Sequence, residues 1–322
     1  MPQVSPTAPR PRRSAGARLL RRAGAAAVLA GAGSFAWAAG YEVRAFRLRR
    51  VTVPVLPTGQ PPLRVLHLSD LHMVPGQRAK ARWVTGLAAL EPDLVVDTGD
   101  NLADENAVPA ALGALGPLLE LPGAFVLGSN DYFGPKPKNP LGYFAGPSTM
   151  RGAARRLPTV DLVKGFVEAG WADLSNARTS LLVDGRRIDV VGVDDPHLRL
   201  DRYLRVSEPA DPAADVTIGV THAPYRRVLD AMTKDGADLV LAGHTHGGQV
   251  CVPGFGALVT NCDLPRRYAK GLHRWEAPGR GARSHGLRAW LNVSAGLGTS
   301  PYAPFRFACP PEATLLTLTA RT

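Results

Sequence analysis

The sequence predicts an α/β protein in which a mixed sheet, or a pair of sheets, is flanked by helices. Short apolar runs alternate with helical stretches in the first half of the body, and hairpin-like β segments follow toward the C-terminus. The 322 residues are 45% hydrophobic and 20% charged, so the chain can bury a substantial core. Disorder is therefore not expected.

The expected strands are short apolar runs that end at polar or turn residues. In chain order they cover residues 63–69, 93–98, 124–128, 187–193, 215–221, 238–242, 288–294 and 313–319. Apolar positions at helical spacing predict helices over residues 79–90, 108–119, 161–169 and 225–234. This order places helices mainly between the early strands, as in βα units.

Residues 1–50 are expected to form a basic leader, and residues 51–322 the folded catalytic domain. The leader holds ten arginines and a single acid, Glu42, so it carries +9 of the formal net charge of +11. The body is thus left with +2, and a basic stripe for nucleic acid is not indicated. No nucleic-acid partner is expected, and the sequence does not reveal the oligomeric state.

A stretch without charged residues runs from about residue 23 to 41 inside this leader. At 1.5 Å per residue it reaches about the 30 Å of a bilayer core, so it predicts a membrane anchor or an export signal. A basic amphipathic or disordered leader is the alternative. Six arginines before the stretch and four after it favour an N-terminus inside and a body outside. The expected location is the cell membrane or the exterior, with the catalytic domain on the extracytoplasmic side.

Two further segments have open interpretations. The Pro-punctuated run "VPVLPTGQPP" is expected to be a linker, and the basic Gly/Pro-rich residues 136–156, with Tyr143 and Phe144, either grip a phosphorylated headgroup or form a solvated loop. The chain has three cysteines, which are too few for a disulfide scaffold. Cys251 and Cys262 pair outside the cytoplasm, or the thiols are free and buried.

Polar side chains follow five of the apolar strands, at the point where each strand ends. They are Asp70 and His72, Asp100, Asn130 and Asp131, His222, and His244 and His246. Each fragment alone is explained by a cap or a turn. Because ligands gather outside the carboxyl ends of strands in open α/β sheets, five such ends in this order predict one shared crevice.

The chemistry of these side chains favours metal ions. Mixed carboxylate and imidazole ligands suit Mn, Fe or Zn, and the lack of thiolates argues against a closed structural zinc site. Two divalent cations about 3.5 to 4 Å apart need a bridging carboxylate, and they neutralise charge on a phosphoryl group during displacement. Hydrolysis of a phosphate ester is the simplest use.

The ordered blocks "DLH", "GD", "GSND", "THAP" and "GHTH" resemble the signature of the calcineurin-like metallophosphoesterase superfamily. The resemblance extends from about Leu63 to "PFRFACPPEATLLTLT", and membrane-associated or exported phosphodiesterases share this layout. It implies a four-layer αββα sandwich of two mixed sheets flanked by helices. It also implies a first metal held by Asp70, His72 and His246, a second held by His222 and His244, and Asp100 as the bridge.

The block "GSND" departs from the family pattern G-N-H-D. In family register Ser129 replaces the asparagine that binds the second metal, and Asn130 replaces the histidine that assists the leaving group. Either Ser129 binds weakly or through water, or the turn shifts and the Asn130 amide oxygen becomes the ligand; we favour Asn130, because a carboxamide oxygen is the better hard ligand. Asp131 keeps its place and is expected to orient the turn.

Asp100, Asn130 and His222 are the residues expected to act in catalysis. His197, in "VDDPHLR", is a candidate proton donor, or else an exposed loop histidine. The expected function is dinuclear metal-dependent hydrolysis of a phosphoester, with a lipid-linked or cell-envelope substrate preferred. A metal-binding scaffold that has lost turnover is the alternative, motivated by the missing family histidine.

Overall fold

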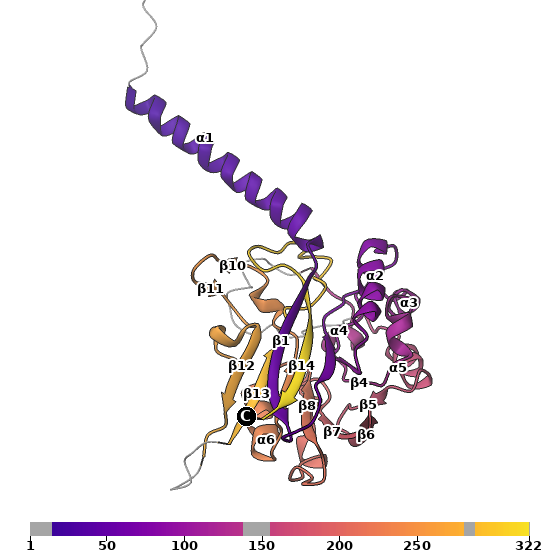
Figure 1. Ribbon diagram of the computed structural model, residues 1–322. Coiled ribbons are helices and arrows are strands. Elements are labelled where there is room, and N and C mark those ends of the chain that lie inside the picture. Colours follow the sequence, from indigo (N-terminus) through magenta and orange to yellow (C-terminus); the bar gives the residue numbers. More distant parts are fainter. Residues whose placement is uncertain (1–14, 138–154, 280–286, 322) are drawn as a thin grey trace, which may run out of the picture.

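Two six-stranded mixed sheets form the centre of the computed structural model, which describes residues 15–137, 155–279 and 287–321 (Figure 1). The first sheet has the spatial order β1 (Arg47–Leu56), β14 (Glu312–Ala320), β2 (Leu63–Leu68), β3 (Leu94–Asp97), β4 (Gly123–Phe125) and β5 (Ala172–Asp173). Strands β2 to β5 run parallel, while β14 is antiparallel to β2 and parallel to β1. The carboxyl ends of β2, β3 and β4 therefore share one edge.

The second sheet is also six-stranded and mixed. Its spatial order is β12 (Gly271–Glu276), β13 (Arg288–Val293), β9 (Leu239–Ala242), β8 (Val216–Thr221), β7 (Arg186–Gly192) and β6 (Arg178–Val183). The central strands β13, β9, β8 and β7 are parallel, and β12 and β6 are antiparallel at the edges. A small hairpin of β10 (Cys251–Val252) and β11 (Gly256–Ala257) stands apart from both sheets.

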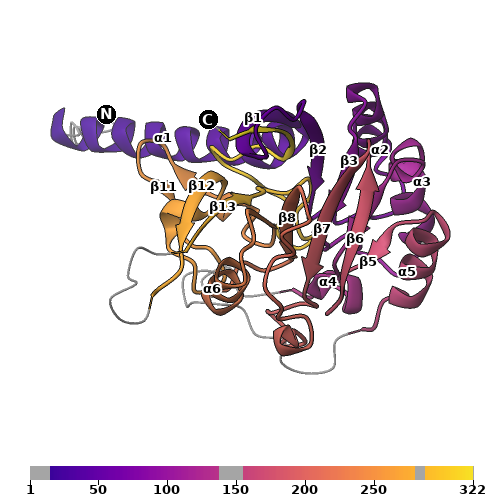
Figure 2. The same ribbon diagram turned by 60° about the horizontal axis from the view of Figure 1, so that its bottom comes forward.

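Helices cover the outer face of each sheet, which gives the four layers expected for the αββα sandwich. The first sheet is covered by α2 (Arg78–Thr85), α3 (Val108–Leu119) and α5 (Thr159–Glu168), which lie together in Figure 2. A 3-10 turn over Gly86–Leu90 extends α2. On the second sheet, α6 (Arg226–Lys234) packs against β12 and β13.

The strands read as continuous apolar runs because both faces of each sheet are covered. On β3, Val95 faces the helices of the first sheet, whereas its neighbour Val96 faces the second sheet. Ile218 and Leu241 enter the same intersheet core from β8 and β9. All four side chains are fully buried, so the two sheets are held rigidly against each other.

All eight expected strands and all four expected helices are present, with small shifts at their ends. The boundary expected between residues 50 and 51 lies inside β1, where Arg50 and Val51 both pair with β14. The expected linker also begins too early, since Val53 and Val55 are buried strand residues. Pro54 is tolerated because β1 is an edge strand, where a missing N–H donor breaks no ladder.

The uncharged stretch of the leader is helical. Helix α1 (Ala15–Ala36) projects from the body in Figure 1 and is followed by a π turn over Trp37–Tyr41 and a 3-10 turn over Glu42–Arg44. Residues Leu19–Arg44 are long and apolar enough to cross a membrane, with a mean hydropathy of 1.3. Membrane anchor and export signal both remain consistent with this helix.

The base of this helix is fixed to the body by polar contacts. The Ala38 carbonyl accepts a hydrogen bond from the Arg306 N–H at 3.1 Å, and the buried Glu42 carboxylate accepts one from the Cys309 N–H at 2.5 Å. Segment 306–309 thus joins the base of α1 to the body.

Candidate metal centre

Every expected ligand lies beyond the carboxyl end of a parallel strand, and the two sheets bring these segments together. Asn130 is in the short helix α4 (Ser129–Tyr132). Asp70 and His72 follow β2, Asp100 follows β3 and Asn130 follows β4. The remaining three, His222, His244 and His246, follow β8 and β9 of the second sheet. The predicted convergence of five strand ends is therefore confirmed.

Ligand atoms gather in two groups that meet at the aspartates. The first group is Asp70, His72 and His246, whose ligand atoms all lie within 4.8 Å of one another; the second, by the same measure, is Asp70, Asp100 and His222. Asp100 stands between the groups, because its Oδ2 lies 3.5 Å from His72 Nε2 and its Oδ1 lies 3.4 Å from His222 Nε2. Oxygen and imidazole donors at this spacing fit divalent cations.

Two of the histidine rings are oriented by hydrogen bonds to backbone carbonyls. His222 donates from Nδ1 to the Thr98 carbonyl at 2.7 Å, which leaves Nε2 to face Asp100. His244 is used in the opposite sense: its Nε2 donates to the Asn261 carbonyl at 3.1 Å, and its Nδ1 lies 3.4 Å from His222 Nε2. Such outer hydrogen bonds orient imidazoles toward a metal and raise their basicity.

The backbone at the ligands is strained. Five of them adopt the left-handed region, with φ of 51° at Asp70, 43° at His72, 60° at Asp100, 69° at His244 and 49° at His246. Each such residue costs about 1 to 3 kcal/mol and persists only where its surroundings fix it. Concentration of this strain at the strand ends is typical of functional sites.

Glycines let the loops approach the aspartates closely. A Cβ at Gly128 would lie 2.3 Å from Asp100 Oδ1, and one at Gly243 would lie 2.7 Å from Asp70 Oδ2. At Gly296 it would lie 2.6 Å from the Asp70 Cβ. A side chain at any of these three positions would therefore collide with the carboxylates or the residues beside them.

The "GSND" turn presents its asparagine to the centre. The Asn130 backbone N–H donates to Asp100 Oδ1 and its amide Nδ2 donates to Asp100 Oδ2, both at 2.7 Å. Asp131 orients the turn as expected, since its buried carboxylate accepts from the N–H groups of Asp100, Asn101 and Gly128 at 2.7 to 2.9 Å.

Burial sets the protonation of the first group. It raises the pKa of Asp70 to about 6 and lowers the pKa of His72 to about 4. Burial also raises the pKa of Asp100, but the neighbouring His222 and His72 outweigh it and hold that pKa well below its usual range. Asp100 is therefore an anion at the middle of the centre, where a cation is stabilised most.

Arg306 supports the centre and was not singled out from the sequence. Its fully buried guanidinium donates to the carbonyls of Ala295 and Gly298, both at 2.7 Å, and lies 3.3 Å from His246 Nδ1. The carbonyl oxygen of Gly298 also lies 3.2 Å from His246 Nδ1. The sequence contains a signal for its burial, because Arg306 and Glu312 are the only charged residues between Arg288 and Arg321.

His197 lies beside the centre rather than on an exposed loop. Its ring centroid is 4.6 Å from that of His244, and its Nδ1 lies 3.1 Å from the Tyr225 hydroxyl. Of the basic segment 136–156, residues 138–154 lie outside the described part of the chain, so its expected role with Tyr143 and Phe144 stays a prediction.

The alternative of a Cys251–Cys262 disulfide is wrong for this structure, in which all three cysteines are free. The thiol next to Cys251 is that of Cys309: both point at the Gly247 carbonyl, at 3.2 and 3.5 Å. Cys262 instead packs against the core between α6 and the second sheet. Proximity in sequence was misleading because β10 pairs with the C-terminal segment at Phe307.

Comparisons with known proteins agree with this geometry. The family model of the calcineurin-like phosphoesterases matches residues 63–248, which contain all seven expected ligands. A phosphodiesterase, YaeI of Escherichia coli, is 26% identical over 91% of this chain and 96% of its own. The uncharacterized protein YpbG of Bacillus subtilis is 29% identical over 62% of this chain and 66% of its own.

A transmembrane protein with a metallophosphoesterase domain from Bos taurus is 27% identical over 62% of this chain. This chain covers 44% of that protein and just under two thirds of YpbG. The solved 5'-nucleotidase precursor of Thermus thermophilus aligns over 80% of this chain with a TM-score of 0.44 and 15% identity. With more than half of its length matched and the ligand cluster assembled, the chain belongs to the calcineurin-like phosphoesterase family of metal-dependent hydrolases.

Proposed function

We propose that this protein is a dinuclear metal-dependent phosphohydrolase that cleaves phosphoester bonds of a membrane or cell-envelope substrate. The observation that carries the proposal is the position of Asp100, whose two carboxylate oxygens each face an imidazole from a different ligand group, His72 or His222. A carboxylate in that position suits a bridge between two cations.

Seven side chains would hold the two cations. Asp70, His72 and His246 with Asp100 would hold the first, and His222, His244 and Asn130 with Asp100 the second. Bound there, Mn, Fe or Zn ions supply Lewis-acid stabilisation of the charge on a phosphoryl group. For Asn130 to bind through its oxygen, its amide turns over so that Oδ1 takes the place now held by Nδ2, which is a rotation of one side-chain torsion.

His197 takes the role of proton donor that the family histidine has elsewhere. Nδ1 of His197 lies 3.1 Å from the Tyr225 hydroxyl, and in this proposal the imidazole supplies a proton to a leaving-group oxygen. The ring lies against His244, a proposed ligand, which places this proton next to the centre. Asp131 holds the backbone of the Asn130 turn and exchanges no proton with substrate.

The membrane assignment of the substrate is supported by α1 and by relatives named as transmembrane proteins. An anchor beside the centre raises the effective concentration of membrane substrates. Phosphodiester substrates are supported by the name of YaeI. The catalytic domain lies on the extracytoplasmic side in this proposal, because arginines are more numerous before the helix than after it.

A metal-binding scaffold without turnover is the second candidate, and Asn130 in place of the family histidine favours it. Hydrolysis of an activated aryl phosphate monoester and diester, with added Mn²⁺, separates the two. Robust activity that is lost in Asp100→Ala and retained in Asp93→Asn, a change at a carboxylate outside the centre that bonds Arg64, supports the enzyme. Metal bound to the wild-type chain without turnover of either ester supports the scaffold.

A further inference from the structure

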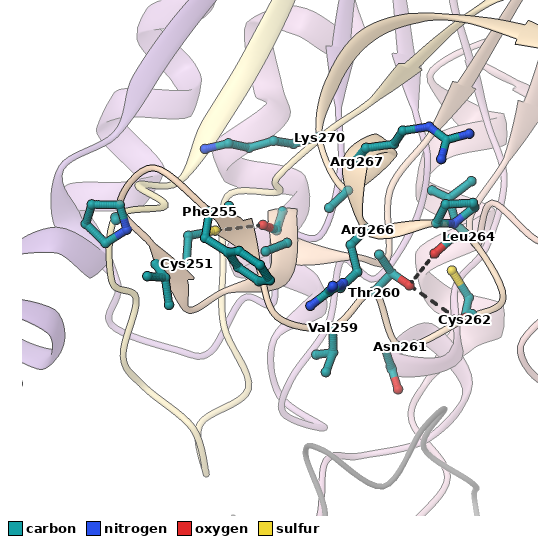
Figure 3. A pocket seen from close by; sticks show the side chains of 18 of the residues that line it. Cys251, Phe255, Val259, Thr260, Asn261, Cys262, Leu264, Arg266, Arg267 and Lys270 are labelled. Carbon is teal, nitrogen blue, oxygen red and sulfur yellow. Dashed lines mark hydrogen bonds between the residues drawn. The ribbon is translucent and has the colours of Figure 1, made fainter.

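Beside the metal centre lies a hollow that the proposed chemistry does not use. Its volume is about 1010 Å³, and it is bounded by the β10–β11 hairpin and by residues 259–270 (Figure 3). Apolar side chains line it together with Arg266, Arg267 and Lys270, and none of the acidic residues in the described part of the chain does. The lining of the hollow is therefore partly apolar and carries positive charge.

The hairpin exposes apolar side chains that a water-facing turn does not need. Val252 and Phe255 are 44% and 61% exposed. The Arg266 guanidinium lies 4.8 Å from the Phe255 ring, so cation and apolar surface form one patch. None of the ion pairs among the described residues uses Arg266, Arg267 or Lys270, so no carboxylate neutralises them there; Arg267 contacts Tyr268, and Lys270 Nζ lies 3.7 Å from Cys309 Sγ.

This patch lies at the end of the body from which α1 leaves. Cys251 of β10 donates its N–H to the Phe307 carbonyl at 2.8 Å, and the same segment 306–309 hydrogen-bonds Ala38 and Glu42 at the base of α1. Figure 1 shows the hairpin and the base of α1 at the same end of the molecule, and in Figure 2 the hairpin again lies next to α1. A bilayer that receives α1 therefore lies near the hairpin.

Exposed aromatic residues lie in the segment at the base of α1. The rings of Trp37 and Tyr41 are 4.4 Å apart and about half exposed, at 52% and 53%. Tyr302, 56% exposed, is in the loop that leads to Arg306. Tryptophan and tyrosine are enriched where a protein meets the interface between membrane and water. Their position at the base of α1 gives the depth at which lipid headgroups begin.

We propose that Val252, Phe255, Arg266, Arg267 and Lys270, here called the hairpin surface, dock on the bilayer and bind the headgroup phosphate of an anionic phospholipid. The inference rests on the proposed membrane association and adds a second contact to it. Val252 and Phe255 enter the acyl boundary, while the three cations take the phosphate. Cations beside a membrane are attracted to an anionic lipid surface.

The hairpin surface is joined to the metal centre through the backbone. Gly247 lines the hollow and directly follows His246, and Asn261 lines it and accepts from His244. A lipid bound at the hollow thus lies next to two proposed ligand histidines. Docking fixes the body against the bilayer with the centre close to the headgroups, which favours phosphorylated lipids as substrates over soluble esters.

Hydrogen exchange of the full chain in nanodiscs tests this inference. Amides of residues 250–258 are compared in nanodiscs of phosphatidylcholine alone and with phosphatidylglycerol added. We expect at least about fivefold slower exchange with phosphatidylglycerol. Arg266→Gln with Arg267→Gln removes this difference, and Val252→Ser with Phe255→Ser removes the protection in both lipids. Equal exchange in detergent and in both nanodiscs overturns the proposal, and equal protection in both lipids overturns its anionic part.

Controls separate this inference from the enzymatic proposal. Leu182→Ser and Arg205→Gln change an exposed apolar and an exposed basic residue of other elements and leave the protection unchanged. Hydrolysis of a soluble aryl phosphodiester is expected to be equal in all these variants, because none touches the centre. Absence of that hydrolysis in every variant contradicts the phosphohydrolase, whereas the exchange result stands independently of it.

Discussion

Asn130 is joined to Asp100 by two hydrogen bonds of 2.7 Å, one from its backbone N–H and one from its side-chain amide. This contact supports the shifted turn, which stays our proposed ligand arrangement. The asparagine is displaced by one residue along the sequence, but its side chain still reaches the carboxylate at the middle of the centre.

Asn130→Ala should lower the affinity for the second cation by about 10- to 100-fold, a range typical when a contact that supports a metal site is lost. Ser129→Ala, the matched change one residue earlier, should have little effect. Isothermal titration of the metal-free chain with Mn²⁺ measures both. The reverse order of the two variants would show that the unshifted register holds.

His197→Gln should lower turnover of esters with poor leaving groups by about 10²-fold, because a general acid contributes most when the departing oxygen is basic. Aryl esters with an acidic phenol should be nearly unaffected. Rates for a series of leaving groups give the slope against leaving-group pKa, which should steepen in the variant. Tyr225→Phe removes only the hydroxyl that lies 3.1 Å from His197 Nδ1 and should cause a smaller loss. An unchanged slope in His197→Gln excludes it as donor.

Arg306→Met should lower the free energy of unfolding by about 1 to 3 kcal/mol for each buried carbonyl that it leaves without a donor. The carbonyls of Ala295 and Gly298 lose their shortest bonds. Urea denaturation of the chain in detergent measures this change. Arg288→Met, at an exposed ion pair with Glu276, serves as the control and should stay within about 0.5 kcal/mol. Equal effects of the two variants would contradict a supporting role for Arg306.

His67 should remain neutral in the folded protein well below pH 6. Burial lowers its pKa from 6.5 to about 3, and its ring lies 3.0 Å from the Thr98 hydroxyl and 2.9 Å from the Asn292 amide. The unfolded chain binds the proton below pH 6.5 and the folded chain does not, so this contribution to stability is complete above pH 6.5 and is lost as the pH falls.

Between pH 7 and pH 5 the loss amounts to about 2 kcal/mol from this residue. His67→Gln should remove that part of the pH dependence, as measured by urea denaturation at both values. The imidazole resonance that His67→Gln removes from the spectrum should not titrate down to pH 4 in the wild-type chain. Titration of that resonance near pH 6 would contradict this assignment.

The sequence predicted the sheets well because their strands are buried on both faces and read as unbroken apolar runs. Strand β1 was not predicted, because Pro54 interrupts its apolar pattern. Its arginines were also assigned to the basic leader, although they belong to an edge strand. Strand β12, with its mixture of polar and aromatic residues, gives no clear apolar run. Its pairing with β13 is a tertiary contact that local pattern does not reveal.

Residue types at strand ends predicted the centre because parallel strands bring their carboxyl ends to one edge. The distances between the loops could not be predicted from the sequence, however. The left-handed backbone at residues such as Asp70 and His246 could not be predicted either. Arg306 was missed because its partners are carbonyl oxygens, which every sequence contains. The neighbour of Cys251 was misjudged because β10 meets a segment more than fifty residues away.

The number of divalent cations bound per chain, in the wild type and in Asp100→Ala, tests the central claim most directly. Because Asp100 faces both ligand groups, we expect two ions in the wild-type chain and one or none in the variant, by elemental analysis after dialysis against Mn²⁺ or Zn²⁺. Retention of two ions by Asp100→Ala, or absence of tightly bound metal from the wild type, would contradict a dinuclear centre bridged by this carboxylate.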